Sequence, residues 1–221
     1  MTVIDSNYPY TVSGILITHL AIIVPSESAD GQWTADKPGS DNITLLAHLP
    51  LGPRLNVSDT DLEQEMHRPY AYVGRMVYGF EGDKGLDIID LHDPSQPKRI
   101  YEWRIENQDL HLGTGGMDVK HFKWNDRYYV VQSLQFRQGG PNPDLGAVIL
   151  DVTGLPDPST AKEVARLRAP YHPGGFHNIF IYKHIPGRVL LITTLAGPYA
   201  HLYDRGYSIE RFLTDVPVTH F

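Results

Sequence analysis

The sequence predicts an all-β fold built from about three repeats of a four-stranded antiparallel sheet. Short apolar runs rich in tyrosine and β-branched residues recur along the last two thirds of the chain, which is typical of strands. The second run of each repeat ends in aspartate and is followed by turn residues. Gly (20) and Pro (17) together exceed their usual share of about 12%, which favours many turns and short elements over long helices.

Composition excludes several classes of function. Hydrophobic residues make up 41% of the 221 positions and charged residues 20%, so the chain is a folded globular one and not a disordered one. The absence of cysteine excludes disulfides, thiolate zinc sites and cysteine nucleophiles. With a net charge of −7 and no basic run, nucleic acid and anionic membrane surfaces are poor partners.

The first 41 residues differ from the rest, and we separate them from a second region, 42–221. Residues 14–25 (GILITHLAIIVP) form an apolar stretch that is too short to span a membrane and about as long as the core of a signal peptide. No Lys or Arg precedes Lys37, so we interpret the stretch as a degenerate export signal or a mis-assigned start, with a buried or interfacial strand as the alternative. The predicted location is extracytoplasmic or secreted, with a cytoplasmic location as the alternative.

The segment before the first repeat divides into an apolar part and an acidic part. Residues 43–51 (ITLLAHLPL) predict a strand, and residues 56–67 predict a single helical turn or a loop. The second stretch lacks the spacing of a calcium-binding loop, so we interpret its carboxylates as a solvated acidic loop. These carboxylates are Asp59, Asp61, Glu63 and Glu65.

Three strands are predicted in each repeat. The first strands are residues 70–76, 128–134 and 188–194. The second strands are residues 85–90, 146–151 and 200–204, and the third strands are residues 98–105, 162–168 and 211–218. The aspartates that end the second strands are expected to accept backbone N–H bonds from the turns that follow. These residues are Asp90, Asp151 and Asp204.

The spacing of these aspartates, 61 and then 53 positions, is typical of β-propeller repeats. A fourth, innermost strand supplied by the segment before each repeat would complete a four-stranded blade, and the blades would cover about residues 66–110, 115–170 and 174–221. An open β-sandwich is the alternative. The positions expected in the core are Tyr72, Val73, Leu86, Ile88, Ile89, Val130, Val131, Val148, Ile149, Leu150, Leu190, Leu191 and Ile192.

Residues 85–97 (GLDIIDLHDPSQP) resemble the LVIVD repeat, a bacterial and archaeal β-propeller motif. The resemblance is good there, fair at 146–158 and weak at 200–206, and it covers roughly residues 66–221. It implies a fold and hardly a function. Propellers typically close with about four to eight blades, so three blades form an incomplete ring, and self-association through open blade faces is expected.

Histidines are the candidate metal ligands. If inner strands line a central channel, imidazoles from different blades would converge there on copper or zinc, although histidines that hydrogen-bond loops, with no metal, are the more common case. The candidate ligands are His121, His177 and His220. No catalytic residue is assigned, because the nucleophile-elbow, phosphate-loop and zinc-protease motifs are all absent.

The leading hypothesis is a propeller-type binding scaffold without an assigned catalytic activity. Its partner would be a protein or a small-molecule ligand at the loop face. The alternative is a metal-dependent propeller enzyme, similar in layout to the selenium-binding/methanethiol oxidase family, in which channel histidines would hold copper.

Overall fold

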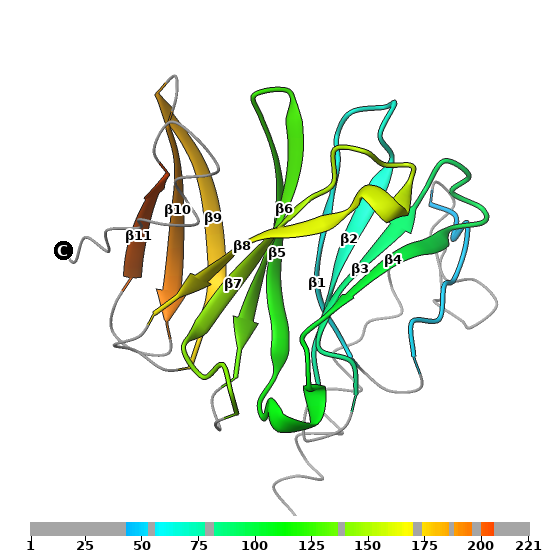
Figure 1. Cartoon of the computed structure of the whole chain (residues 1–221). Helices are drawn as coiled ribbons and strands as arrows, with labels where there is room; N and C mark the ends of the chain where they lie inside the picture. Colours follow the sequence, from blue (N-terminus) through cyan, green and yellow to red (C-terminus); the bar gives the residue numbers. More distant parts are fainter. Residues whose placement is uncertain are drawn as a thin grey trace, which may run out of the picture. The chain divides into compact units, whose positions relative to one another are not determined.

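The computed structural model describes residues 43–52, 56–77, 82–136, 140–169, 174–185, 188–195 and 200–205 (Figure 1). The chain divides into two compact units, residues 1–48 and 49–221. In the first unit only 43–48 are described, and they form no strand. Residues 49–52 form none either, so the strand predicted over 43–51 is wrong.

The second unit contains three antiparallel sheets, which confirms the prediction of an all-β fold with four-stranded antiparallel sheets (Figure 1). Sheet 1 has the order β1 (Val57–Leu62), β2 (Tyr70–Arg75), β3 (Gly85–Asp90) and β4 (Lys98–Arg104). Sheet 2 has the order β5 (Gly115–Trp124), β6 (Arg127–Gln135), β7 (Leu145–Asp151) and β8 (Lys162–Arg168). Sheet 3 consists of β9 (Phe176–Ile185), β10 (Arg188–Leu195) and β11 (Ala200–Arg205), with β10 in the middle.

Two short 3₁₀ helices connect these strands, η1 (Gln108–Leu110) and η2 (Pro158–Thr160). Among the residues that the structure describes, no helix is long and apolar enough to cross a membrane.

The eight predicted strands that fall on described residues are confirmed, with ends that agree to within one residue. The ninth, residues 211–218, lies outside the described residues. The prediction of a helical turn or loop over 56–67 is wrong in its first half, because Val57–Leu62 is strand β1. Sheet 1 therefore begins at Val57, ahead of the predicted boundary at residue 66, and β1 is the fourth strand that was expected from the segment before residue 70.

Strand register shows that the three sheets repeat one pattern. The aspartate that ends the second strand lies opposite the equivalent residue in each sheet: Asp90 opposite Tyr70, Asp151 opposite Tyr129 and Asp204 opposite Leu190. The Oδ1 atom of Asp90 accepts the backbone N–H of His92 at 2.8 Å, and that of Asp151 accepts the N–H of Thr153 at 3.0 Å. The expected turn-stabilising role is thus confirmed for Asp90 and Asp151, while the side chain of Asp204 lies outside what the structure describes.

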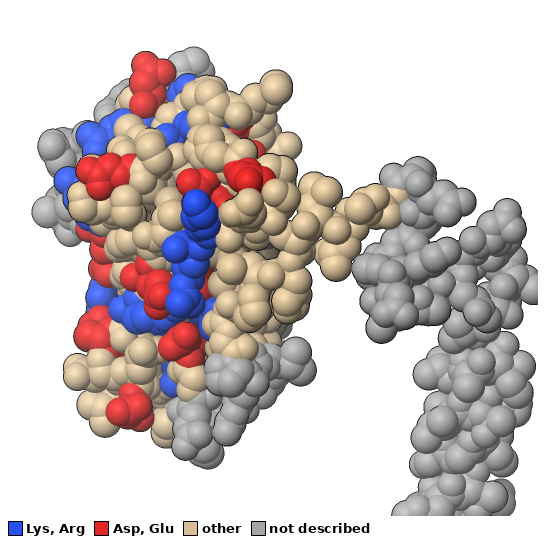
Figure 2. Space-filling view, turned by 90° about the vertical axis from the view of Figure 1, so that its right-hand side faces the viewer, with Lys and Arg blue, Asp and Glu red and all other residues tan. Residues whose placement is uncertain are grey.

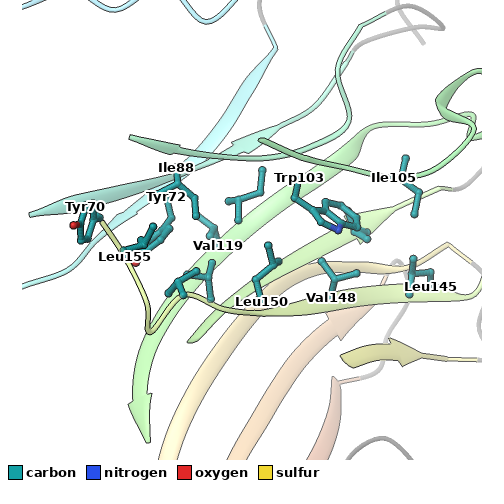
Figure 3. Close-up of a cluster of buried hydrophobic side chains, with 14 of the residues drawn as sticks. Tyr70, Tyr72, Ile88, Trp103, Ile105, Val119, Leu145, Val148, Leu150 and Leu155 are labelled. Carbon is teal, nitrogen blue, oxygen red and sulfur yellow. The ribbon is translucent and has the colours of Figure 1, made fainter. Parts of the chain in front are cut away.

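Sheets 1 and 2 pack face to face through a large apolar cluster (Figure 3). Tyr72 and Ile88 of sheet 1 point toward Val148 and Leu150 of sheet 2, and all four are completely buried. At roughly 25 cal/mol per Å² of buried apolar surface, contacts of this kind dominate the stability of the pair.

The opposite face of sheet 2 packs on sheet 3 through a second cluster, which includes Val131, Ile149, Ile179 and Leu191. Of the thirteen predicted core positions, eleven are buried. Leu190 is only half-buried and Ile192 is exposed, so their assignment to the core is wrong. Both lie on the face of β10 that is turned away from sheet 2.

Charged side chains of both signs are interspersed over the face of the molecule shown in Figure 2, with no large patch of one sign.

Sheet 1 also holds charges in its interior. The completely buried Asp87 carboxylate accepts from Arg75 at 2.6 Å and from Arg104 at 2.5 Å. Pairing of this kind is required for a buried carboxylate, because an isolated one would be neutralised.

Gly146 on β7 is a point of close approach between sheets 2 and 3. A Cβ atom there would lie 2.4 Å from the ring of Phe176. We expect Gly146→Ala to lower the free energy of unfolding by about 1–3 kcal/mol, the usual effect of overfilling a packed core. Urea denaturation checks this, and an unchanged midpoint would contradict the packing of Phe176 against β7.

Candidate functional site

The first strand of each sheet, β1, β5 or β9, is called its inner strand below. These three edge strands share a bulge at equivalent positions. In each strand, a segment of four residues pairs with a segment of only three residues on the neighbouring strand of the sheet. The longer segments run from Val57 to Thr60, from Gly116 to Val119 and from Phe176 to Ile179. A bulge re-aims the side chains beside it and is a frequent feature near functional sites. The re-aimed pairs are Ser58 and Asp59, Met117 and Asp118, and His177 and Asn178.

All three bulges line one pocket of about 990 Å³. Its polar wall comes from all three inner strands and from β10, and its apolar wall includes Met76, Met117, Phe180 and Ile192. Ligand sites in proteins combine apolar walls with a few convergent polar groups in this way. The polar residues are Ser58, Asp59, Asp118, Lys120, His177, Asn178, Thr193 and Thr194.

Two carboxylates and one ammonium group form the charged centre of the pocket. The Lys120 Nζ atom donates to Asp118 and, at 3.2 Å, to Asp59. Burial raises the pKa of Asp118, and the neighbouring Asp59 raises it further. Burial opposes ionisation of Asp59 as well, but its hydrogen bonds with Asp118 and Lys120 outweigh that effect and lower its pKa. The two carboxyl groups therefore differ in their readiness to hold a proton.

The pocket wall also contains hydroxyl groups with unmet hydrogen-bonding capacity. The side-chain oxygens of Ser58 and Thr193 are buried and have no hydrogen-bond partner within the described part of the chain. Thr193 is only 1% exposed. Buried polar groups are nearly always hydrogen-bonded, so such an atom beside a pocket points to a ligand or water as its partner.

His177 lies at this pocket, held by a short glycine segment. A Cβ atom on Gly175, whose φ is +71°, would lie 1.9 Å from the carbonyl oxygen of Leu134, so glycine lets the start of β9 approach β6. The His177 Nδ1 atom lies 3.3 Å from Oε1 of Gln135. The imidazole is exposed and faces the pocket space.

His121 lies in a different environment. It lines a second pocket of about 540 Å³, and its Nδ1 atom lies 2.8 Å from Oδ2 of Asp61. Asp61 also accepts the backbone N–H of His121 at 2.7 Å. By strand register His121 is equivalent to Ile181 and not to His177, because His121 lies opposite Val130 and Ile181 lies opposite Leu191.

The structure thus places His121 and His177 in separate pockets, while His220 lies outside the described residues. No group of three or more His, Asp or Glu side chains suited to hold a metal occurs among the residues described. The pairing of His121 with a carboxylate through Nδ1 is an arrangement that metal-ligating histidines also use. The metal assignment stays a prediction.

The acidic segment is not a solvated loop, and this correction matters for the site. Asp59 and Asp61 lie on β1, where their carboxylates bond to β5. Glu63 is 8% exposed and binds Arg68 at 2.6 Å. Glu65 is half-buried, and its Oε2 accepts from the Tyr128 hydroxyl at 2.5 Å. Asp59, Asp61 and Glu65 therefore all bond to side chains or backbone of sheet 2, and the local sequence does not reveal such distant partners.

The Asp61–His121 contact predicts a pH dependence. Burial alone would raise the pKa of Asp61, but its bonds to His121 lower it below 3.8. Because the folded-state pKa lies below the unfolded one, the stabilisation is complete above pH 3.8 and is lost as pH falls through the folded-state value. Melting temperatures measured from neutral to acid pH should therefore converge for the wild type and Asp61→Asn. A difference that is constant with pH would contradict this.

The residues that the sequence did not single out are Asp118, Lys120 and Asn178. A signal for two of them is present in hindsight: a Gly–Gly pair precedes Asp118 at 115–116 and Asn178 at 174–175. The lengths of the two segments differ by one residue, which hides the correspondence until the register of β5 and β9 is known.

Comparisons with known proteins identify no family. No family model matches the chain, and no curated protein does. Among solved structures, the chain matches a GH43_1 enzyme from Xanthomonas citri, whose crystal structure is a complex with xylotriose. The match has 11% sequence identity, covers 72% of this chain and 73% of that one, and has a TM-score of 0.28.

Proposed function

We propose that the three sheets are successive blades of a β-propeller-type repeat that serves as a binding module. The recurrent sheet order, the shared inner-strand bulge and the face-to-face packing of successive sheets support the propeller-type repeat. The resemblance of residues 85–97 to the LVIVD repeat agrees with it. Export of the chain remains a separate prediction, since residues 1–42 lie outside the described residues.

The observation that carries the binding role is the convergence of three equivalent bulges on one pocket. We propose that this pocket takes a small, uncharged, polyhydroxylated molecule. Lys120 lies between the two carboxylates and offsets the charge of one of them, so a neutral ligand suits the site. Asp59, Asn178 and Thr193 offer hydrogen bonds, while Phe180 offers an apolar surface beside them.

Isothermal titration calorimetry with a panel of neutral oligosaccharides tests this role, with citrate as an anionic comparison. We expect a neutral member to bind and citrate not to bind. Asp118→Ala should weaken binding about tenfold or more, because a hydrogen bond to a charged group contributes about 1.5–3 kcal/mol. Asp109→Ala, which removes an exposed carboxylate outside the pocket, is the matched control. Binding that Asp118→Ala leaves unchanged would contradict the assignment of the pocket.

The second candidate is the metal-dependent enzyme, for which the Asp61–His121 pair is the one favourable observation. Metal analysis of the purified chain tests it. Stoichiometric copper or zinc that is lost in His121→Ala would favour this candidate over the binding module.

A further inference from the structure

Sheets 1 and 2 are each covered on one face by the next sheet along the chain. One face of sheet 1, with Tyr72 and Ile88, is covered by sheet 2, and one face of sheet 2, with Val131 and Ile149, is covered by sheet 3. Strand register places Tyr72, Val131 and Ile192 at equivalent positions. In each sheet, this residue lies two positions after the residue that pairs with the aspartate at the end of the next strand. The same face therefore exists three times.

Exposure at these equivalent positions differs sharply in sheet 3. Tyr72 is 0% exposed and Val131 is 1% exposed, whereas Ile192 is 36% exposed. The same holds on the inner strand, where Phe122 is 7% exposed and its equivalent Tyr182 is 47% exposed. Phe180, beside Ile192 in the register, is 59% exposed. Sheet 3 thus presents the kind of apolar face that a following sheet covers in the other two cases.

A polar contact marks the same interface. Asp118 on β5 accepts the backbone N–H of Ile179 on β9 at 2.7 Å, and Asp59 on β1 lies 3.4 Å from the N–H of Val119 on β5. The equivalent residue on β9 is Asn178, whose side chain is exposed and has a carbonyl oxygen able to accept the same bond. β9 is the edge strand of sheet 3, and among the described strands no further inner strand lies beside it to donate such a bond.

The corresponding face at the other end is already covered. Ala71, Val73 and Ile89 of sheet 1 are between 4% and 6% exposed, and Leu49 and Leu51 pack against them. A second copy of the chain therefore has no free sheet 1 face to place on sheet 3. This favours a further sheet over head-to-tail pairing of copies.

We propose that the face of sheet 3 formed by Phe180, Tyr182, Leu190 and Ile192 is a docking surface for a fourth sheet of the same repeat, supplied by a further repeat of the polypeptide. Its inner strand would lie beside β9 and donate a backbone N–H to Asn178. The inference rests on the propeller-type repeat proposed above. Because Asn178, Phe180 and Ile192 also line the pocket, docking is tested in the absence of ligand.

Cysteine labelling tests whether the face is open. The chain has no cysteine, so single replacements react without background. We expect Ile192→Cys and Tyr182→Cys to react with a maleimide about tenfold faster or more than the matched controls Val131→Cys and Phe122→Cys. Equal rates in folded variants would overturn the proposal, because the face would then be covered already. Ligand binding is measured separately on the unsubstituted chain, because Ile192 lines the pocket, so a failure of the docking proposal leaves the proposed role of the pocket standing.

An added repeat tests the docking itself. A copy of residues 112–169 joined after Phe221 through a flexible linker should slow the labelling of Ile192→Cys about tenfold or more. The control copy carries Val130→Lys and Leu150→Lys, which place charges on the face that sheet 2 turns to sheet 1, and it should give no protection. Replacing Asn178 by Ala should reduce the protection. An added sheet that stays unfolded, or that leaves the labelling rate unchanged, overturns the proposal.

Discussion

Replacing Arg68 by Met is expected to lower the free energy of unfolding by about 3–5 kcal/mol, the usual effect of removing one partner of a buried ion pair. The Arg68 side chain is 7% exposed and that of Glu63 is 2% exposed, with 2.6 Å between Nε and Oε2. Without the guanidinium group, the Glu63 carboxylate would keep only the Tyr72 hydroxyl as a described hydrogen-bond donor.

Arg68 also joins sheets 1 and 2, which adds to the expected loss. Its guanidinium group donates to the backbone carbonyl of Val152 at 3.0 Å and to those of Thr153 and Leu155 at 3.3 and 3.4 Å. It lies 3.9 Å from the ring centroid of Tyr128. Three carbonyls at the edge of sheet 2 would therefore lose their cationic partner, while the Tyr128 ring would keep Lys123, whose Nζ lies 4.9 Å from its centroid.

Arg127→Met is the matched control. Arg127 pairs with Asp151 but is 52% exposed, so its loss should change the free energy of unfolding by less than about 1 kcal/mol. Chemical denaturation of both variants measures the difference. Equal effects of the two substitutions would contradict the buried position of Arg68 between the sheets.

Replacing Ile149 by Ala is expected to lower the free energy of unfolding by about 2–5 kcal/mol, the usual range for truncating a buried isoleucine. Ile149 is 6% exposed and lies in the cluster between sheets 2 and 3, so the cavity would open inside the packed interface. The comparison variant is Ile192→Ala on the open face of sheet 3, with an expected effect below about 1 kcal/mol. A larger effect at Ile192 than at Ile149 would reverse the assignment of the two faces.

The sequence allowed prediction of the strands that local patterns delimit. β3 and β8 have the predicted bounds because turn residues punctuate both ends, as with Asp90 and the proline-containing turn that precedes Lys162. A fourth strand was expected before residue 70, but the bounds of β1 were not predicted because its residues are mostly polar. Asp59 and Asp61 satisfy their hydrogen-bonding capacity on β5, sixty positions away, which no local pattern reveals.

The same limit applies to the core and to the site. Ile192 has the sequence environment of a core residue, yet it is exposed, and among the described strands no sheet covers its face of β10. His177 was recognised from its glycine context, but Asp118 and Asn178 became candidates only when the bulges of β5 and β9 proved equivalent. A one-residue bulge changes which side chains share a face, so a site built on bulges is hidden from strand periodicity.

The inner strands lie side by side around one pocket, joined by carboxylate-to-amide bonds. Amide hydrogen exchange at Ile179, followed by NMR, tests this most directly, because Asp118 accepts that amide at 2.7 Å. We expect slow exchange in the wild type and exchange about tenfold faster or more in Asp118→Ala, with the amides of Val131 and Ile149 unchanged. Exchange at Ile179 that is equally fast in both proteins would contradict the arrangement.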